Sequence, residues 1–207
     1  MKVKILLPLS AAILCFTLGA CNNVGKGSTD KSSDSGISSE AAKGAPESTP
    51  ALVGLLHQAA LDGDLNGVEK ALESGANVNG VDEEGRTALM FAAFNGHSDI
   101  VLTLLEDEAG IDRRDLMGRT ALLYAATGPF PETVRILLDK GAEANVVDSD
   151  EHFSPLMHAA AEGNLDVVKI LLKGGSDPTL KDVDGDDAAS FARQGGHLEV
   201  ADYLDAL

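Results

Sequence analysis

A short motif recurs every 33 or 34 residues through most of this chain. The segment GRTALMFAAFNGH begins at Gly85, and GRTALLYAATGPF begins at Gly118, which is 33 residues later. A third copy, SPLMHAAAEGN, begins at Ser154, and a fourth, DAASFARQGGH, begins at Asp187. Self-similarity at such a period is the signature of a repeat protein, in which one supersecondary unit is stacked on copies of itself. The period therefore constrains the fold more strongly than any single motif does.

Each copy predicts a pair of helices joined by a glycine-containing turn. A residue that favours the helix N-cap precedes the first apolar run in every copy: Thr87, Thr120, Ser154 and Asp187. Leu89, Ala92 and Ala93 then form an i, i+3, i+4 stripe, which is one narrow helical face. A second apolar run, such as residues 100–105, predicts the second helix. Glycines such as Gly75 are suited to the left-handed position that ends it.

This pattern resembles the ankyrin repeat, whose hallmark is D-x-x-G-x-T-P-L-H-x-A-A followed by G-H, L-L and G-A-x-x-N. Five repeats cover residues 51–207, at approximately 51–81, 82–114, 115–147, 148–181 and 182–207. The resemblance implies an all-α solenoid of antiparallel helix pairs, with hairpin loops that project like fingers. It also implies an extended concave surface, which suits binding better than it suits a buried catalytic group.

The sequence departs from the ankyrin hallmark at a few positions. The hallmark histidine is present only as His57, and the later repeats have Met90, Leu123, Met157 and Ser190 in its place. The Thr–His hydrogen bond of the family is therefore expected to be mostly missing. In repeat 3, Pro129-Phe130 replaces Gly-His, and repeat 4 has one extra residue near Glu151.

The first twenty residues have the layout of a bacterial secretion signal. Lys2 and Lys4 precede an apolar run that is too short to span a bilayer. Residues 18–21 read Leu-Gly-Ala-Cys and resemble the lipobox of bacterial lipoproteins, which implies cleavage before Cys21 and lipidation of that cysteine. Two or more acyl chains anchor a protein stably to a membrane. The alternative is an ordinary cleaved signal that happens to be followed by a cysteine.

The expected organisation is a signal peptide at 1–20, a lipidated cysteine with a tether at 21–50, and a repeat domain at 51–207. The tether is rich in Ser, Gly, Lys and Asp, a composition that favours disorder. Asn22 follows the cysteine, where an Asp would imply retention in the inner membrane. The resemblance therefore implies the periplasmic face of the outer membrane, or the outer face of a cell with a single membrane.

The charge balance argues against nucleic acid as a partner. The chain has 33 acidic and 16 basic side chains, for a net charge of −17. Such a surface repels nucleic acid phosphates and anionic lipid heads. Cys21 would be the only cysteine after cleavage, so neither a disulfide framework nor a thiolate metal site is expected. No nucleophile motif or nucleotide-binding loop is present, which predicts no cofactor, no metal and no enzymatic activity.

One stretch, DRRDLMGR at residues 112–119, stands out in this acidic chain because it gathers three arginines around Leu-Met. The repeat register places it at a finger between repeats 2 and 3. Exposed aromatic, Met and Arg side chains are the types enriched in interface hot spots. The predicted partner-binding set on one face is Arg86, Phe94, Arg114, Leu116, Met117, Arg119 and Phe153. In the alternative, Leu116 and Met117 pack against the adjacent finger and the arginines neutralise nearby carboxylates.

The sequence favours a monomeric, membrane-anchored scaffold that holds or inhibits a protein partner in the cell envelope, for example as an immunity-type binder. A second hypothesis is similarity to periplasmic ankyrin proteins that support catalase and defence against oxidative stress, by haem delivery or enzyme stabilisation. Met90, Met157 and His158 are the candidate haem ligands, but core packing is the favoured interpretation of these positions. A hydrolase is a weaker alternative. The identity of the partner does not follow from the sequence.

Overall fold

A computed structural model describes residues 49–207, and these residues form ten helices arranged as five antiparallel pairs. The predicted signal peptide, Cys21 and nearly all of the tether lie outside the described residues. The helices are α2 (Pro50–Asp62), α3 (Leu65–Glu73), α4 (Ala88–Phe94), α5 (Ser98–Glu106), α6 (Ala121–Ala126), α7 (Pro131–Asp139), α8 (Pro155–Ala161), α9 (Leu165–Lys173), α10 (Ala188–Gln194) and α11 (Leu198–Asp205). The predicted all-α class is confirmed.

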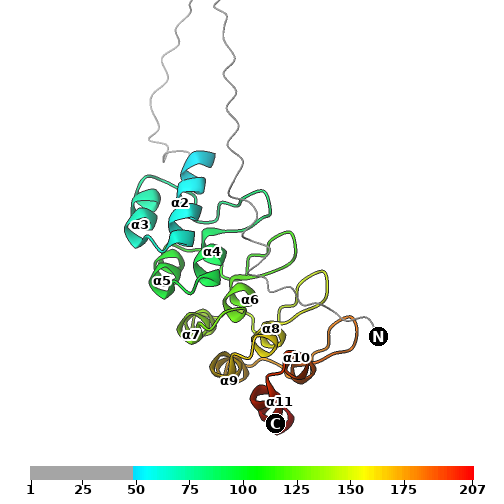
Figure 1. Cartoon of the computed structure of the whole chain (residues 1–207). Coiled ribbons are helices and arrows are strands. Elements are labelled where there is room, and N and C mark those ends of the chain that lie inside the picture. The colour runs from blue at the N-terminus through cyan, green and yellow to red at the C-terminus, as the bar shows by residue number, and fades with distance from the viewer. Residues whose placement is uncertain (1–48) are drawn as a thin grey trace, which may run out of the picture. The chain divides into compact units, whose positions relative to one another are not determined.

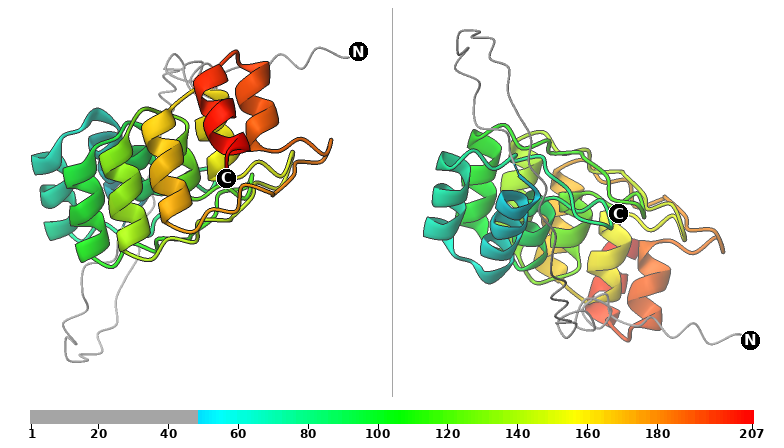
Figure 2. Two further views of the ribbon diagram at one scale, coloured as in Figure 1. Left: turned by 90° about the horizontal axis from the view of Figure 1, so that it is seen from below. Right: turned by 90° about the horizontal axis from the view of Figure 1, so that it is seen from above.

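The pairs stack in chain order and form two layers (Figure 1). Helices α2, α4, α6, α8 and α10 make one layer, and α3, α5, α7, α9 and α11 make the other. The main helix–helix contacts lie within a pair or between neighbouring pairs, as the stacked-repeat hypothesis predicts. The loops between pairs all project from the α2–α10 layer in the same direction (Figure 2). We call these loops the fingers.

The four predicted N-caps are confirmed. Thr87, Thr120, Ser154 and Asp187 each accept a hydrogen bond from the backbone N–H three residues ahead, at 2.9–3.4 Å. In α4 and α8 the methionine that replaces the hallmark histidine completes this cap. The backbone N–H of Thr87 donates to the sulfur of Met90, and that of Ser154 donates to Met157, both at 3.4 Å. A weak sulfur acceptor thus satisfies a buried N–H of the N-cap residue.

The first helix begins earlier than the sequence predicts. Thr49 is the N-cap of α2, and its side chain accepts from the N–H of Leu52 at 3.3 Å. Pro50 is the first helical residue, where its fixed φ is favourable. The helix therefore includes Pro50, the last residue of the segment expected to be a tether, and Thr49 caps it.

Close packing at the turns fixes the distance between repeats. Gly96 has a φ of 71°, and the ring of Phe130 lies so close that a Cβ at Gly96 would be only 2.3 Å from it. The same turn one repeat earlier packs Gly63 against His97, whose Nε2 donates to the carbonyl of Leu61 at 3.2 Å. His97 thus contributes a structural hydrogen bond between neighbouring repeats. Phe130 replaces this imidazole in repeat 3 and keeps the packing without the bond.

Asparagine and aspartate side chains tie the bases of the fingers together. Asn79 accepts from the N–H of Gly110 at 2.7 Å, and Asn145 accepts from the N–H of Asp177 at 2.8 Å. Between them, Asp112 accepts from the N–H of Glu143 at 3.0 Å. These acceptors recur every 33 residues, and each reaches the following repeat. The ladder therefore holds the fingers in register above the helix stack.

Candidate functional site

Each of the four fingers is built around one aspartate. The carboxylates of Asp82, Asp115, Asp148 and Asp182 each accept two backbone N–H groups of their own finger, at 2.8–3.2 Å. Backbone hydrogen bonds then join neighbouring fingers: Leu116 to Glu84, Ser149 to Met117, and Val183 to Glu151. The fingers are consequently a connected surface, and their side chains are presented from a fixed backbone.

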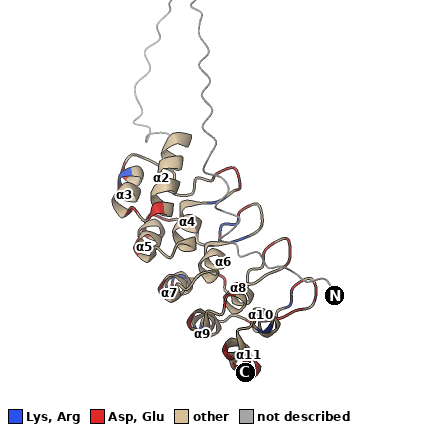
Figure 3. Cartoon of the chain, in the orientation of Figure 1, with Lys and Arg blue, Asp and Glu red and all other residues tan. Residues whose placement is uncertain are grey.

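The finger between repeats 2 and 3 differs from the others in its side chains. Leu116 is 75% exposed and Met117 is 38% exposed, while Arg113 and Arg114 are also exposed. Leu116 touches the adjacent finger through its backbone N–H, but most of its side chain faces solvent. The other fingers present mainly acidic and small polar groups at their tips, as Figure 3 shows for the charged residues. We call Arg114, Leu116, Met117 and Arg119 the central finger surface.

The arginines of the first two fingers occupy equivalent positions but have different surroundings. Arg86 donates to Asp82 at 2.7 Å and to Glu84 at 3.0 Å, and its guanidinium lies 5.0 Å from the centre of the Phe91 ring. Arg119, 33 residues later, forms no ion pair with any described carboxylate. It is half-buried, and its enclosed Nε has no hydrogen-bond partner among the described residues.

Tyr124 explains the different surroundings of Arg119. Its hydroxyl donates to the second carboxylate oxygen of Asp115 at 2.7 Å, which is the oxygen that Arg86 uses on Asp82. Burial raises the pKa of Tyr124, and the hydrogen bond to Asp115 and its charge raise it further, while Arg119 opposes them. Tyr124 therefore remains protonated and keeps donating to Asp115. Phe91 stands at the equivalent position of repeat 2 and has no hydroxyl to compete with Arg86.

Aromatic side chains line the foot of the fingers, and most of them were not in the predicted binding set. Phe94 meets the edge of Tyr124 at 6.1 Å between ring centres. Phe153 is half-buried and packs against both His158 at 5.5 Å and Phe191 at 4.9 Å. A usable signal was present in the sequence, because Phe91, Tyr124, His158 and Phe191 share one position of the repeat. Phe94 and Phe153 thus belong to this aromatic row more than to the exposed surface.

Among the described histidines, His158 has the largest shift in pKa. It is 7% exposed, and its Nε2 has no hydrogen-bond partner there. Burial lowers its pKa to about 4, and the positive charge of Arg119 adds to this effect. His158 is therefore neutral at physiological pH and lies within electrostatic range of Arg119.

The sequence comparisons agree with this geometry. The family described as "Ankyrin repeats (3 copies)" matches residues 56–148 and 128–205, which together cover more than half of the chain. The chain belongs to the ankyrin-repeat family. Arrays of ankyrin repeats are scaffolds for protein–protein interaction, and the similarity extends over all five helix pairs.

Several curated ankyrin-repeat proteins are similar to this chain. An ankyrin repeat protein of Acanthamoeba polyphaga mimivirus is 24% identical over 73% of this chain and 16% of its own length. The ankyrin repeat and KH domain-containing protein mask-1 of Caenorhabditis elegans is 29% identical over 69% of this chain and 4% of its own. The palmitoyltransferase Hip14 of Drosophila melanogaster is 28% identical over 59% of this chain and 14% of its own length. The chain spans under a fifth of each relative, so the similarity concerns the repeats.

Two of the three candidate haem ligands are core residues of this ankyrin array. Met90 and Met157 are each 2% exposed, and their sulfur atoms accept the N-cap hydrogen bonds described above. His158 is enclosed under Phe153.

Within residues 49–207, no three His, Cys, Asp or Glu side chains are grouped so that they could hold a metal ion. None of the helices in this range is long and apolar enough to cross a membrane.

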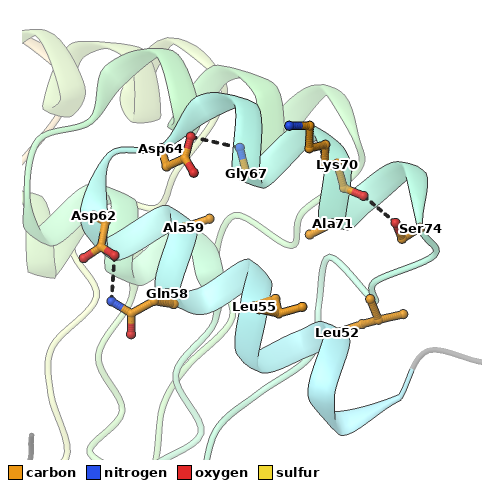
Figure 4. Close-up of a pocket in the computed structure, with 10 residues that line it drawn as sticks. All are labelled: Leu52, Leu55, Gln58, Ala59, Asp62, Asp64, Gly67, Lys70, Ala71 and Ser74. Carbon is orange, nitrogen blue, oxygen red and sulfur yellow. Dashed lines mark hydrogen bonds between the residues drawn. The ribbon is translucent and has the colours of Figure 1, made fainter.

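An open groove lies at the first ankyrin repeat, between α2 and α3 (Figure 4). Leu52, Leu55, Ala59 and Ala71 form its apolar part. The polar side chains at its rim already form hydrogen bonds within the repeat: Gln58 donates to Asp62 at 2.8 Å, and Asp64 accepts from the N–H of Gly67 at 3.0 Å. This is the face that an additional preceding repeat would cover in a longer array. No described residue outside α2, α3 and their junctions lines it.

Proposed function

We propose that this ankyrin array is an envelope-anchored scaffold that holds or inhibits a protein partner through the central finger surface. The observation that carries the proposal is the exposed Leu116–Met117 pair beside arginines that lack internal carboxylate partners. Burying a leucine side chain at an interface contributes roughly 1.5–3 kcal/mol. Binding, rather than catalysis, is proposed because the fingers offer a projecting surface instead of a cleft.

The backbone of the fingers supports this role. The hydrogen bonds between Leu116 and Glu84, and between Ser149 and Met117, fix the central finger on both sides. A preorganised surface loses little conformational entropy on binding, so more of the contact energy appears as affinity. The acidic tips of the neighbouring fingers would disfavour partners that lack complementary charge.

Replacing both apolar residues should abolish capture of the partner. We expect the Leu116→Glu/Met117→Glu chain to recover much less of the partner from envelope extract than the wild-type chain does. The matched control is Val183→Glu, because Val183 follows Asp182 as Leu116 follows Asp115 and is also exposed, at 52%. Mass spectrometry of the captured proteins gives the measurement. Equal recovery by wild-type and double-variant chains would show that the partner binds elsewhere.

The envelope location is proposed from the sequence of the first residues. Leu18-Gly19-Ala20-Cys21 follows an apolar run, and the segment between Cys21 and α2 could act as a spacer between a lipid anchor and the fingers. A protein held by two or more acyl chains remains with the membrane through washing. The anchor would thus keep the scaffold beside partners that enter or occupy the envelope.

The anchor has its own test. We expect the wild-type chain to incorporate labelled palmitate in bacteria and to fractionate with membranes. Cys21→Ser should be unlabelled and should lose the membrane association, because the thiol that carries the lipid is gone. Cys15→Ser is the control, since that residue lies within the expected signal and should leave labelling intact. Membrane association of Cys21→Ser equal to wild type would overturn the lipid anchor without affecting the finger surface.

A further inference from the structure

The arginines of the described residues fall into two groups. Arg86 pairs with Asp82 and Glu84, Arg135 pairs with Glu132, and Arg193 pairs with Asp205. The other three, Arg113, Arg114 and Arg119, have no carboxylate within ion-pair distance in residues 49–207. All three belong to one finger of a strongly acidic chain. The chain has 33 acidic side chains, so these three arginines lack carboxylate partners because of how the finger is folded and not because carboxylates are scarce.

Of these three arginines, Arg119 alone is half-buried, and it interacts with the hydroxyl of Tyr124 but pairs with no carboxylate in residues 49–207. Arg113 and Arg114 are exposed, where water and salt screen a charge effectively. Arg119 is half-buried, with an Nε that neither solvent nor any described acceptor reaches. A buried donor without a partner costs roughly 1–3 kcal/mol. Because only Nε is enclosed, the terminal nitrogens of this half-buried side chain are the donors that a partner can reach.

Repeat 2 shows what Arg119 lacks. In that repeat, one oxygen of Asp82 accepts two backbone N–H groups and the other accepts from Nε of Arg86 at 2.7 Å. In repeat 3, Asp115 binds its own backbone in the same way, but Tyr124 occupies the second oxygen. The tyrosine hydroxyl therefore separates Arg119 from its own carboxylate. One oxygen atom, present in Tyr124 and absent from Phe91, distinguishes the two sites.

The surroundings of Arg119 also suit an incoming acceptor. The terminal guanidinium nitrogens of Arg119 are always hydrogen-bond donors, and they are not among the enclosed atoms. Leu116 and Met117, on the same finger, provide apolar surface next to this polar point. An acidic side chain flanked by an apolar one would match both features.

We propose that Arg119 is the carboxylate-binding residue of the central finger surface, and that it receives an Asp or Glu side chain from an acidic–apolar segment of the partner protein. Tyr124 is the positioning residue, since its hydrogen bond to Asp115 keeps Arg119 available. This inference rests on the proposed function and specifies the chemistry of the partner. A single carboxylate fits better than a long acidic run, which the acidic neighbouring fingers would repel.

Selection of peptides provides the test. The probe is a phage-displayed library of random heptapeptides, panned against the immobilised full chain. We expect the selected peptides to place Asp or Glu beside a large apolar residue. Their affinity for each chain is then measured by fluorescence anisotropy. Replacing the peptide's acid by its amide should weaken binding to the wild-type chain about tenfold, as expected for loss of a charge-assisted hydrogen bond.

Three variants separate the proposed role from a structural one. Arg119→Gln should raise the Kd about tenfold, and so should Tyr124→Phe, because Asp115 is then free to pair with Arg119 as Asp82 pairs with Arg86. Arg135→Gln is the control, and we expect it to leave the Kd within about twofold of wild type, since Arg135 lies on α7 outside the predicted binding set and its ion pair with Glu132 is exposed. With the amide peptide, the effects of Arg119→Gln and Tyr124→Phe should disappear.

The possible failures can be told apart. Peptides that require Leu116 but bind Arg119→Gln and wild-type chains equally would overturn the carboxylate role and leave the finger surface intact. Selection of peptides without acidic residues would also overturn the carboxylate role and leave the finger surface intact. Peptides that bind the Leu116→Glu chain as well as wild type, or a library that yields no binder, would count against both the surface and the carboxylate role. Thermal unfolding of each variant confirms that the chain is folded.

Discussion

Asp115→Ala is expected to lower the free energy of unfolding by roughly 3 kcal/mol, more than the equivalent change in the next finger. Asp115 is 8% exposed and accepts three hydrogen bonds, from the N–H groups of Met117 and Arg119 and from the hydroxyl of Tyr124. Alanine would leave these donors without their acceptor in a buried site. Each such loss costs about 1 kcal/mol or more, and bonds to a charged group cost more than neutral ones.

Asp148→Ala is the matched control for this prediction. Asp148 is similarly buried and accepts from the N–H groups of Glu151 and Phe153, but no tyrosine is bonded to it. We expect it to cost roughly 1–2 kcal/mol, for two bonds instead of three. Urea unfolding followed by circular dichroism gives both values. A result in which Asp115→Ala costs no more than Asp148→Ala would mean that the Tyr124 bond contributes nothing to stability.

The 33-residue period was sufficient to predict the architecture. It located the N-caps at Thr87, Thr120, Ser154 and Asp187 and the class of fold, because each depends on residues that are close in sequence. The left-handed position predicted at Gly75 is present too, with a φ of 88°. Repetition also averages out local ambiguity, since one strong copy fixes the register of its weaker neighbours.

The hydrogen-bond partners of the finger arginines could not be predicted from the repeat period. Arg86 and Arg119 both lie in the local motif G-R-T-A-L, so the sequence predicts the same hydrogen-bonding environment for both. The difference comes from the residues five positions further on: Phe91 lies against the guanidinium of Arg86, whereas the hydroxyl of Tyr124 bonds the finger aspartate Asp115, and both contacts exist only in the folded chain. The predicted binding set therefore combined residues with distinct environments: compensated Arg86, exposed Leu116, and the half-buried rings of Phe94 and Phe153.

The role of the methionines was also invisible in the sequence. Met90 and Met157 occupy the position of the hallmark histidine, and their sulfur atoms accept the N–H groups of the N-cap residues. The expectation that the family's Thr–His bond is missing was sound, but the sequence could not show that a methionine sulfur would complete the caps of α4 and α8. The burial of His158 was equally hard to foresee, because the ring that covers it, Phe153, comes from the preceding finger.

Acid should destabilise the array well above the pH at which carboxylates protonate, and His158 should be the main cause. Burial, assisted by the charge of Arg119, lowers the pKa of His158 to about 4, compared with about 6.5 for an unfolded histidine. Between these values the unfolded state binds more protons than the folded state, so the stability contributed by His158 is complete above pH 6.5 and is lost as the pH falls towards 4. The expected loss between pH 7 and pH 5 is about 2 kcal/mol.

His158→Phe should remove most of this pH dependence. Phenylalanine already occupies the equivalent position in repeats 2 and 5, as Phe91 and Phe191, so the ring is expected to fit. A smaller slope should remain from His57, whose pKa is also lowered by burial, against the opposing hydrogen bond to the carbonyl of Gly80. His152→Gln is the control, because that side chain is exposed and the variant should keep the wild-type slope. Urea unfolding at several pH values measures all three, and an unchanged slope in His158→Phe would show that another group governs acid sensitivity.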